Sequence, residues 1–166
     1  MQKKILYLDM DGVVADFDKA IEQFIPDLHT NHNYHDNETR SAKVDAICQS
    51  NPDIFHDLPP IDGAVEATKK LFEIYDVYFL STAMWNVPNS FTGKRIWIEK
   101  HFGELAKKRL ILTHRKDLAI GDILVDDRLK NGAGEFKGLH IHFATEKYPN
   151  WSVVLPYLER VAQHSL

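Results

Sequence analysis

The sequence predicts an α/β protein with a Rossmann-like parallel sheet, helices on both faces of that sheet, and a small helical cap inserted into the chain. From residue 61 onward, short apolar runs alternate with segments of helical periodicity. Such alternation is typical of parallel strands joined by helices. Residues 18–60 interrupt the alternation. We therefore expect residues 1–17 and 61–166 to form the core and residues 18–60 to form the inserted cap.

The core is expected to begin with a strand over residues 5–8. Four apolar residues there are followed at once by acidic residues and Gly12, which indicates a short buried strand. Apolar residues with amphipathic spacing then predict a helix over residues 13–25, ended by Pro26. The cap is expected to contain a polar loop over 27–40, a short helix over 39–50 and a connection rich in Pro and Asp over 51–60.

The remaining core elements follow in alternation. Helices are expected over residues 62–74, 91–102 and 151–163, and strands over 77–80, 109–112, 123–125 and 139–143. Gly103 directly follows the second of these helices, and glycine is the residue that most often terminates a helix. The order of these elements favours a single parallel sheet.

The composition is that of an ordinary globular domain. The chain has 166 residues, a formal net charge of −4 and one cysteine. The length fits one domain with a small insertion. The charge argues against binding to a nucleic-acid polymer. The apolar run before Asp9 has only four residues, too few for a signal peptide or a membrane span. We therefore expect no membrane partner and a cytoplasmic location, while the sequence says nothing of oligomeric state.

Polar side chains recur just past the carboxyl ends of the predicted strands. Asp9 and Asp11 follow the first strand. The later strands are followed by Ser81 with Thr82, by Lys116, and by Asp126 with Asp127. Ligands bind at this edge of an open parallel sheet, so groups that are distant in sequence can share one crevice.

Carboxylates, a hydroxyl and a lysine in one crevice suit phosphoryl transfer. Clustered carboxylates repel one another unless a cation neutralises them, and an all-oxygen ligand set favours Mg²⁺. One carboxylate can attack phosphorus to form an aspartyl phosphate, while another protonates the leaving oxygen and later activates water. The hydroxyl and the lysine can hold the transferring oxygens and offset their charge. The predicted cofactor is therefore Mg²⁺.

The segment from Asp9 to Phe17 resembles the first motif of the haloacid dehalogenase superfamily. Its longer form, D-M-D-G-V-x-A-D-F, resembles the 5′(3′)-deoxyribonucleotidase family in particular. Ser81 with Thr82, Lys116, and Asp126 with Asp127 resemble the second, third and fourth motifs. The segment Lys94–Gly103 resembles a further helix of that family. The likeness implies a haloacid dehalogenase-like fold.

The resemblance implies roles for the acidic residues. Asp9 would be the nucleophile and, through its side chain, a Mg²⁺ ligand. Asp11 would be the general acid and base, would contact the substrate, and would bind the metal through its backbone carbonyl. Asp127 would be the third protein ligand, with Asp126 as its neighbour or alternative.

The resemblance also implies substrate contacts by Phe17, Ser81, Thr82, Lys94 and Lys116. Ser81 stands where the family has threonine, and both residues offer a hydroxyl. Lys116 would neutralise phosphate charge, and Lys94, on a helix start that looks exposed, would be a second phosphate-site lysine. Phe17 would pack against the nucleoside, although its place on the apolar face of the predicted helix fits core packing equally well.

The function implied is that of an enzyme, a phosphoric monoester hydrolase of the 5′-nucleotidase type. It would be a magnesium-dependent phosphatase of (deoxy)ribonucleoside monophosphates that works through an aspartyl phosphate. The alternative is the same chemistry on another small phosphate ester, such as a sugar phosphate. A non-enzymatic receiver-like module is disfavoured, because a receiver carries its paired acids near the first strand, whereas here Asp126 and Asp127 come late. Trp85 fits either the pocket or its rim, and the base preference stays open.

Overall fold

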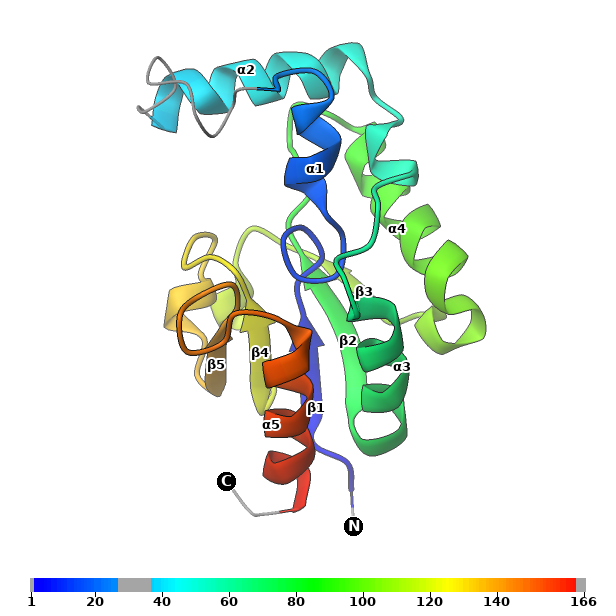
Figure 1. Ribbon diagram of the computed structural model, residues 1–166, viewed down its shortest axis with the longest axis vertical. Helices are drawn as coiled ribbons and strands as arrows, with labels where there is room; N and C mark the ends of the chain where they lie inside the picture. The colour runs from blue at the N-terminus through cyan, green and yellow to red at the C-terminus, as the bar shows by residue number, and fades with distance from the viewer. Residues whose placement is uncertain (1, 27–36, 164–166) are drawn as a thin grey trace.

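A five-stranded parallel sheet forms the centre of the protein (Figure 1). The computed structural model describes residues 2–26 and 37–163. The strands are β1 (Ile5–Leu8), β2 (Asp76–Ser81), β3 (Leu110–Leu112), β4 (Ile123–Asp126) and β5 (Leu139–His142). They lie in the order β3-β2-β1-β4-β5, and every neighbouring pair is parallel. The predicted fold class is confirmed, with each strand within one or two residues of its expected place.

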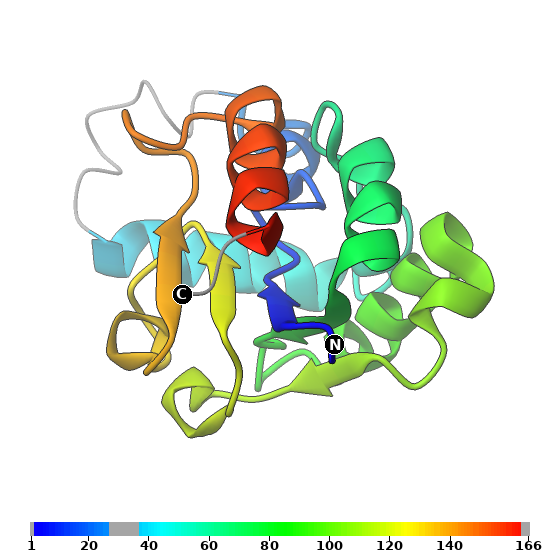
Figure 2. The same ribbon diagram turned by 90° about the horizontal axis from the view of Figure 1, so that it is seen from below.

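Helices cover both faces of the sheet, with the longer α-helices on one face and a short 3₁₀ helix on the other. The helices are α3 (Ala64–Ile74), α4 (Asn89–Phe102) and α5 (Trp151–Gln163). α3 and α5 lie side by side on one face (Figure 2), and Phe102 of α4 packs against Phe79 of β2 with ring centroids 5.0 Å apart. On the opposite face, Tyr7 and Leu124 pack beneath Ala133 of the 3₁₀ helix η5 (Ala133–Glu135).

The helix predicted over residues 13–25 was wrong in its first turn. The structure has a tight loop there, followed by the short helix α1 (Phe17–Glu22). Gly12 has a positive φ of 78°, and the amides of Val13, Val14 and Ala15 all point to the carbonyl of Met10. Asp16 then caps α1 by accepting from the amide of Lys19. The two valines are buried because the loop turns inward, not because they lie on a helix face.

The same loop is attached to the distant helix α5. The indole Nε1 of Trp151 donates to the carbonyl of Val13 at 2.8 Å, and the indole is 2% exposed. A buried carbonyl without a partner would cost about 1–3 kcal/mol, so this bond stabilises the turn that follows β1.

Between α1 and α3, the described part over residues 37–58 lies beyond the carboxyl ends of the strands (Figure 1). It contains α2 (Asn37–Ser50) and the 3₁₀ helix η2 (Ile54–His56). The predicted helix over 39–50 is confirmed and begins earlier, so the loop expected over 27–40 was wrong for residues 37–40. Residues 27–36 of that loop lie outside the described residues. Within the described ranges, no helix is long and apolar enough to cross a membrane.

Candidate active site

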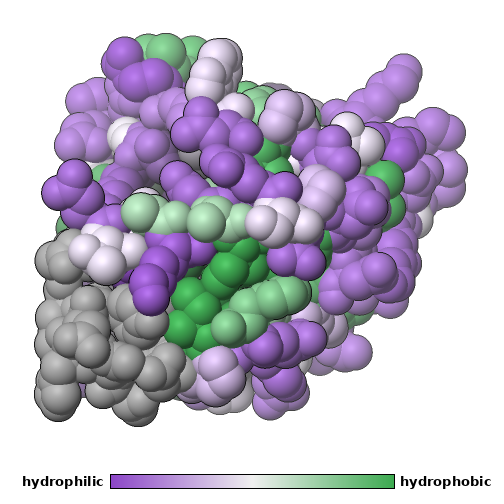
Figure 3. Space-filling model, turned by 90° about the horizontal axis from the view of Figure 1, so that it is seen from above, coloured by the Kyte–Doolittle hydropathy of each residue, from purple (hydrophilic) through white to green (hydrophobic). Residues whose placement is uncertain are grey.

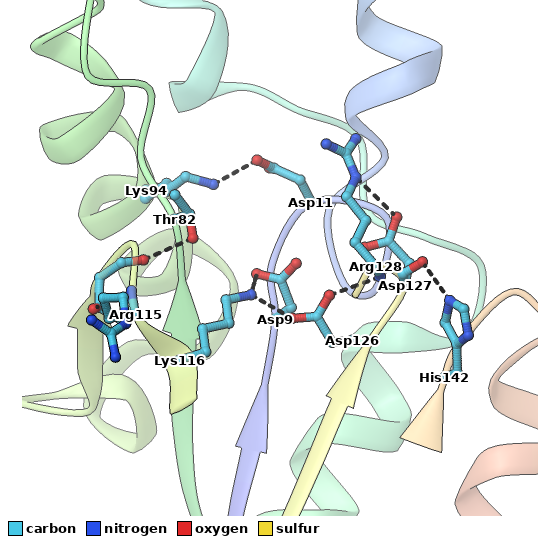
Figure 4. A network of polar contacts seen from close by, with 11 residues as sticks. Asp9, Asp11, Thr82, Lys94, Arg115, Lys116, Asp126, Asp127, Arg128 and His142 are labelled. Atoms are coloured by element: carbon cyan, nitrogen blue, oxygen red, sulfur yellow. Dashed lines mark hydrogen bonds and ion pairs between the residues drawn. The ribbon is translucent and has the colours of Figure 1, made fainter. Parts of the chain in front are cut away.

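The predicted site residues converge at the carboxyl ends of three adjacent strands. β1 is central, with β2 and β4 as its neighbours, and the register aligns Leu8 with Phe79 and Val125. Asp9 and Asp126 therefore lie at the same level, and Ser81 lies one residue further along its strand. Figure 4 shows Asp9 and Asp126 turned toward Lys116, with Asp11 and Lys94 meeting above them. This is the edge at which ligands bind in open parallel sheets.

A buried lysine holds two of these carboxylates together. Lys116 lies on the 3₁₀ helix η4 (Lys116–Leu118) and is 3% exposed. Its Nζ lies 3.0 Å from Oδ1 of Asp9 and also bonds to Oδ2 of Asp126. Burial alone would lower the pKa of Lys116, but the charges of Asp9 and Asp126 outweigh burial and raise it. The ammonium is therefore a permanent positive charge beside Asp9.

The two acids after β4 differ in their partners: Asp126 has both oxygens hydrogen-bonded, whereas Asp127 has Oδ2 in an ion pair with Nε of Arg128 at 3.7 Å and Oδ1 open. Asp126 accepts from Lys116 with Oδ2 and from the amide of Arg128 with Oδ1. Oδ1 of Asp127 is buried and has no hydrogen-bond partner among the described residues. Burial, reinforced by the charge of Asp9, raises the pKa of Asp126 to about 6 and that of Asp127 to about 7. One lysine therefore does not balance the negative charge of this cluster.

The donor set fits a hard divalent cation. Oxygens of Asp9, Asp126 and Asp127 lie within 4.8 Å of one another. Mg²⁺ prefers such oxygens, and its charge would offset the repulsion that adds to burial in raising the two pKa values. Because both oxygens of Asp126 are already engaged, the open oxygen of Asp127 is the better placed ligand of the pair.

A glycine lets Asp127 approach the loop after β1. A Cβ added to Gly12 would lie 2.3 Å from Oδ2 of Asp127, and the φ of Gly12 is +78°. Any other residue would both strain the backbone and push this carboxylate away. The glycine of the first motif thus sets the position of the open carboxylate.

Asp11 is held by Lys94, which is not exposed as predicted. Nζ of Lys94 lies 2.7 Å from Oδ2 of Asp11, and the lysine side chain is 1% exposed. α4 carries its first turns inward against η2, so the exposed-looking start of this helix is buried. Lys94 is absent from the described residues that line the cavity, whereas Asp11 lines it.

The hydroxyls of Ser81 and Thr82 differ in their hydrogen bonding. Oγ of Ser81 is buried and has no hydrogen-bond partner among the described residues. Oγ1 of Thr82 donates to the carbonyl of Thr113 at 2.7 Å, which ties the end of β2 to the end of β3. Both residues line the cavity, but Ser81 has the hydroxyl that is open to a ligand.

A cavity of about 340 Å³ lies between these strand ends and the segment above them. Phe17 lines it and stacks on Phe55, with ring centroids 5.6 Å apart and planes inclined by 14°. Phe17 therefore packs against the core and also faces the cavity, and its contact with a nucleoside stays a prediction. Trp85 lies on the rim, 77% exposed. From the side of α2, the surface is mainly hydrophilic around a hydrophobic area (Figure 3).

Sequence reasoning missed several polar residues that line this cavity. They are Arg40, Ser41 and Asp45 of α2, His114 after β3, and Arg128 after β4. Of these residues, only Arg128 could have been placed in the cavity from the sequence, because it directly follows Asp126 and Asp127. The residues of α2 come from a helix without marked amphipathic patterning, and nothing in their spacing indicates which face turns inward.

This sheet order, with carboxylates, a lysine and a hydroxyl at its carboxyl edge, defines a haloacid dehalogenase-like hydrolase. Solved structures share the fold. The haloacid dehalogenase-like hydrolase YfnB of Bacillus subtilis matches with a TM-score of 0.58 and 11% identity, over 90% of this chain and 92% of that one. A hydrolase of the same class from Xanthomonas campestris matches with a TM-score of 0.54 and 10% identity, over 98% of both chains.

The chain belongs to the family described as 5′ nucleotidase, deoxy (pyrimidine), cytosolic type C protein, whose model matches residues 3–150. A Vibrio phage KVP40 protein assigned as a 5′(3′)-deoxyribonucleotidase is 42% identical over 156 residues, which cover 94% of this chain and 85% of the relative. The human cytosolic 5′(3′)-deoxyribonucleotidase is 29% identical over 140 residues, which cover 73% of this chain and 69% of the human protein. The predicted family, and with it the predicted enzyme class of phosphoric monoester hydrolases, is confirmed.

Replacing Gly12 with alanine should weaken Mg²⁺ binding by about 10- to 100-fold, because the new methyl group displaces Asp127. Isothermal titration calorimetry measures the affinity. Gly103→Ala is the matched control: its φ is also positive, at +54°, but no atom lies within 4 Å of the added Cβ. Equal affinities in the two variants would show that the contact with Asp127 does not matter.

Proposed function

We propose that the protein is a magnesium-dependent phosphatase that hydrolyses (deoxy)ribonucleoside monophosphates through an aspartyl phosphate on Asp9. One observation carries the proposal. Asp9 ends the central strand 3.0 Å from a buried lysine, in the same cavity as the open Ser81 hydroxyl. The family to which the chain belongs, and the deoxyribonucleotidase names of its relatives, support a nucleoside monophosphate as substrate.

Mg²⁺ is the proposed cofactor, held by the side chains of Asp9 and Asp127 and by the backbone carbonyl of Asp11. The open oxygen of Asp127 supports this ligand set, as does the magnesium in the structure of YfnB, a protein of the same fold. When bound, the ion would neutralise charge on the phosphate and on the carboxylates around it.

The reaction then has two displacement steps at phosphorus. In the first, an oxygen of Asp9 forms a bond to phosphorus while the bond to the leaving oxygen breaks, and Asp11 protonates that oxygen. In the second, Asp11 takes a proton from water, the water oxygen bonds to phosphorus, and the Asp9 carboxylate is released. Lys116 and the Ser81 hydroxyl hold the phosphoryl oxygens and offset their charge.

Residues 18–60 are proposed as a cap that covers this chemistry. α2 lies beyond the strand ends, and its Arg40, Ser41 and Asp45 line the cavity. A cover there would exclude bulk water from the aspartyl phosphate and contact the leaving nucleoside. Phe17, between the core and this segment, would then contact the sugar or the base.

A phosphate-release screen over ribo- and deoxyribonucleoside monophosphates tests the function. We expect turnover with Mg²⁺, none in EDTA, and recovery when Mg²⁺ is returned, because the carboxylate cluster needs a cation. Sugar phosphates are the comparison set. Faster turnover of sugar phosphates than of every nucleotide would favour the alternative substrate class, and full activity in EDTA would contradict the metal requirement.

Asp9→Asn should abolish turnover with the fold intact, because the amide keeps the shape of the side chain but is a poor nucleophile. Rapid-quench measurements with ³²P-labelled nucleotide should trap acid-stable labelled protein in the wild type and none in the variant. Asp62→Asn, at an exposed position before α3, is the control and should behave as wild type. Labelling of the Asp9→Asn protein would place the nucleophile elsewhere.

Phe17→Ala should raise the KM for a nucleotide about tenfold, because stacking on a base is worth about 1–3 kcal/mol. The KM for p-nitrophenyl phosphate, which lacks a nucleoside, should change much less. Phe24→Ala removes a phenylalanine that is 46% exposed and lines a different groove, and should alter neither value. Equal changes for both substrates would assign Phe17 to core packing alone.

A further inference from the structure

We infer that His142 is a positioning residue for Asp127, the acid to which the proposed function gives the role of a Mg²⁺ ligand. The inference rests on that proposed function. Nε2 of His142 lies 3.1 Å from the backbone carbonyl oxygen of Asp127, and Figure 4 shows the imidazole turned toward Asp127 from β5. Because a carbonyl oxygen can only accept, Nε2 carries the proton and donates the hydrogen bond. The histidine thus holds the backbone of Asp127 and leaves its carboxylate to a ligand.

The bond from His142 continues the pairing of β4 and β5 beyond its last backbone contact. The two strands are parallel, and Asp126 is aligned with His142. The amide of Phe143 donates to the carbonyl of Asp126 at 2.9 Å. The next carbonyl along the chain is that of Asp127, and within the described residues its hydrogen-bond partner is the side chain of His142. A side chain therefore does for Asp127 what a backbone amide does for Asp126.

The carboxylate of Asp127 has few restraints of its own. Oδ1 has no hydrogen-bond partner among the described residues, and Oδ2 lies 3.7 Å from Nε of Arg128, which is beyond hydrogen-bond distance. Gly12 leaves room for the carboxylate without bonding to it, since an added Cβ would lie 2.3 Å from Oδ2. One oxygen from each of Asp9, Asp126 and Asp127 lies within 4.8 Å of the other two. This grouping therefore depends on where the backbone holds Asp127.

The imidazole of His142 is itself held in place. His140 and His142 project from the same face of β5, as alternate residues of a strand do, and their rings stack with centroids 5.7 Å apart and planes inclined by 25°. Oγ1 of Thr145 donates to the carbonyl of His142 at 2.7 Å, which fixes the end of the strand. The half-buried ring therefore reaches Asp127 already oriented, and the bond costs little further conformational entropy.

His142→Phe tests the inference, because phenylalanine keeps a flat ring for stacking on His140 and removes the donor. Isothermal titration calorimetry with Mg²⁺ alone should give a dissociation constant about tenfold higher than in the wild type, since groups behind a metal ligand have effects of this size. His142→Gln should bind Mg²⁺ nearly as the wild type does, because its amide can donate to the same carbonyl. His101→Phe, against Trp97 on α4 with ring centroids 4.2 Å apart, is the matched control and should also bind as the wild type does.

An unchanged Mg²⁺ affinity in His142→Phe would overturn the inference. A glutamine variant as weak as the phenylalanine variant would also overturn it, because the ring would then act by packing and not by its donor. Thermal unfolding in EDTA checks that each variant folds. If His142→Phe does not fold, the wild type still decides: a ¹H–¹⁵N spectrum of the histidine rings should show the proton of His142 on Nε2, and a neutral ring protonated on Nδ1 would refute the bond.

Steady-state kinetics separate positioning of the metal ligand from a general structural defect. In His142→Phe, the Mg²⁺ concentration for half-maximal turnover of a nucleoside monophosphate should rise about tenfold, while kcat and KM at saturating Mg²⁺ stay near the wild-type values. A lower kcat with an unchanged Mg²⁺ requirement would contradict the inference. The calorimetric comparison needs no nucleotide. A wild type that binds Mg²⁺ but hydrolyses no nucleotide would therefore refute the proposed function and leave the calorimetric result for His142 standing.

Discussion

The charge balance around Asp9 is the constraint on which the rest of the site depends. A central strand delivers a carboxylate to the same edge at which its neighbour β4 delivers two more. A single buried ammonium, that of Lys116, lies between Asp9 and Asp126. Burial, reinforced by the negative charge of Asp9, raises the pKa of Asp127. The carboxylate cluster is thus arranged to receive positive charge.

A second buried ammonium, that of Lys94, pairs with the other carboxylate of the first motif. Lys94 and Lys116 are both almost fully buried, and each is paired with a carboxylate of the first motif. Lys116 faces Asp9 from the sheet side, while Lys94 approaches Asp11 from the side of α4 (Figure 4). The two acids of the motif, two residues apart, therefore lie in separate electrostatic surroundings. Such a separation is what assigns different roles to neighbouring carboxylates.

Much of the fold could be predicted from the sequence, because short apolar runs and helical periodicity are local signals. The parallel sheet, α3, α4 and α5 followed from them, and the positions of Asp9, Ser81 and Asp126 followed from the ends of the strands. The loop over Val13 and Val14 did not, because tertiary contacts bury these residues in a turn that has the apolar spacing of a helix. The burial of Lys94 also escaped prediction, since it depends on the packing of α4 against Phe55, a residue far away in sequence.

The bond from Trp151 to the carbonyl of Val13 joins residues 138 positions apart. The turn that carries the first motif therefore cannot take its final form on the ribosome until α5 has emerged and docked. At an earlier stage, before β4 has been made, Asp9 also lacks the two acids that lie beside it in the finished sheet. The order of synthesis thus leaves the catalytic edge among the last parts of the molecule to become competent, although the residue at its centre is among the first to be made.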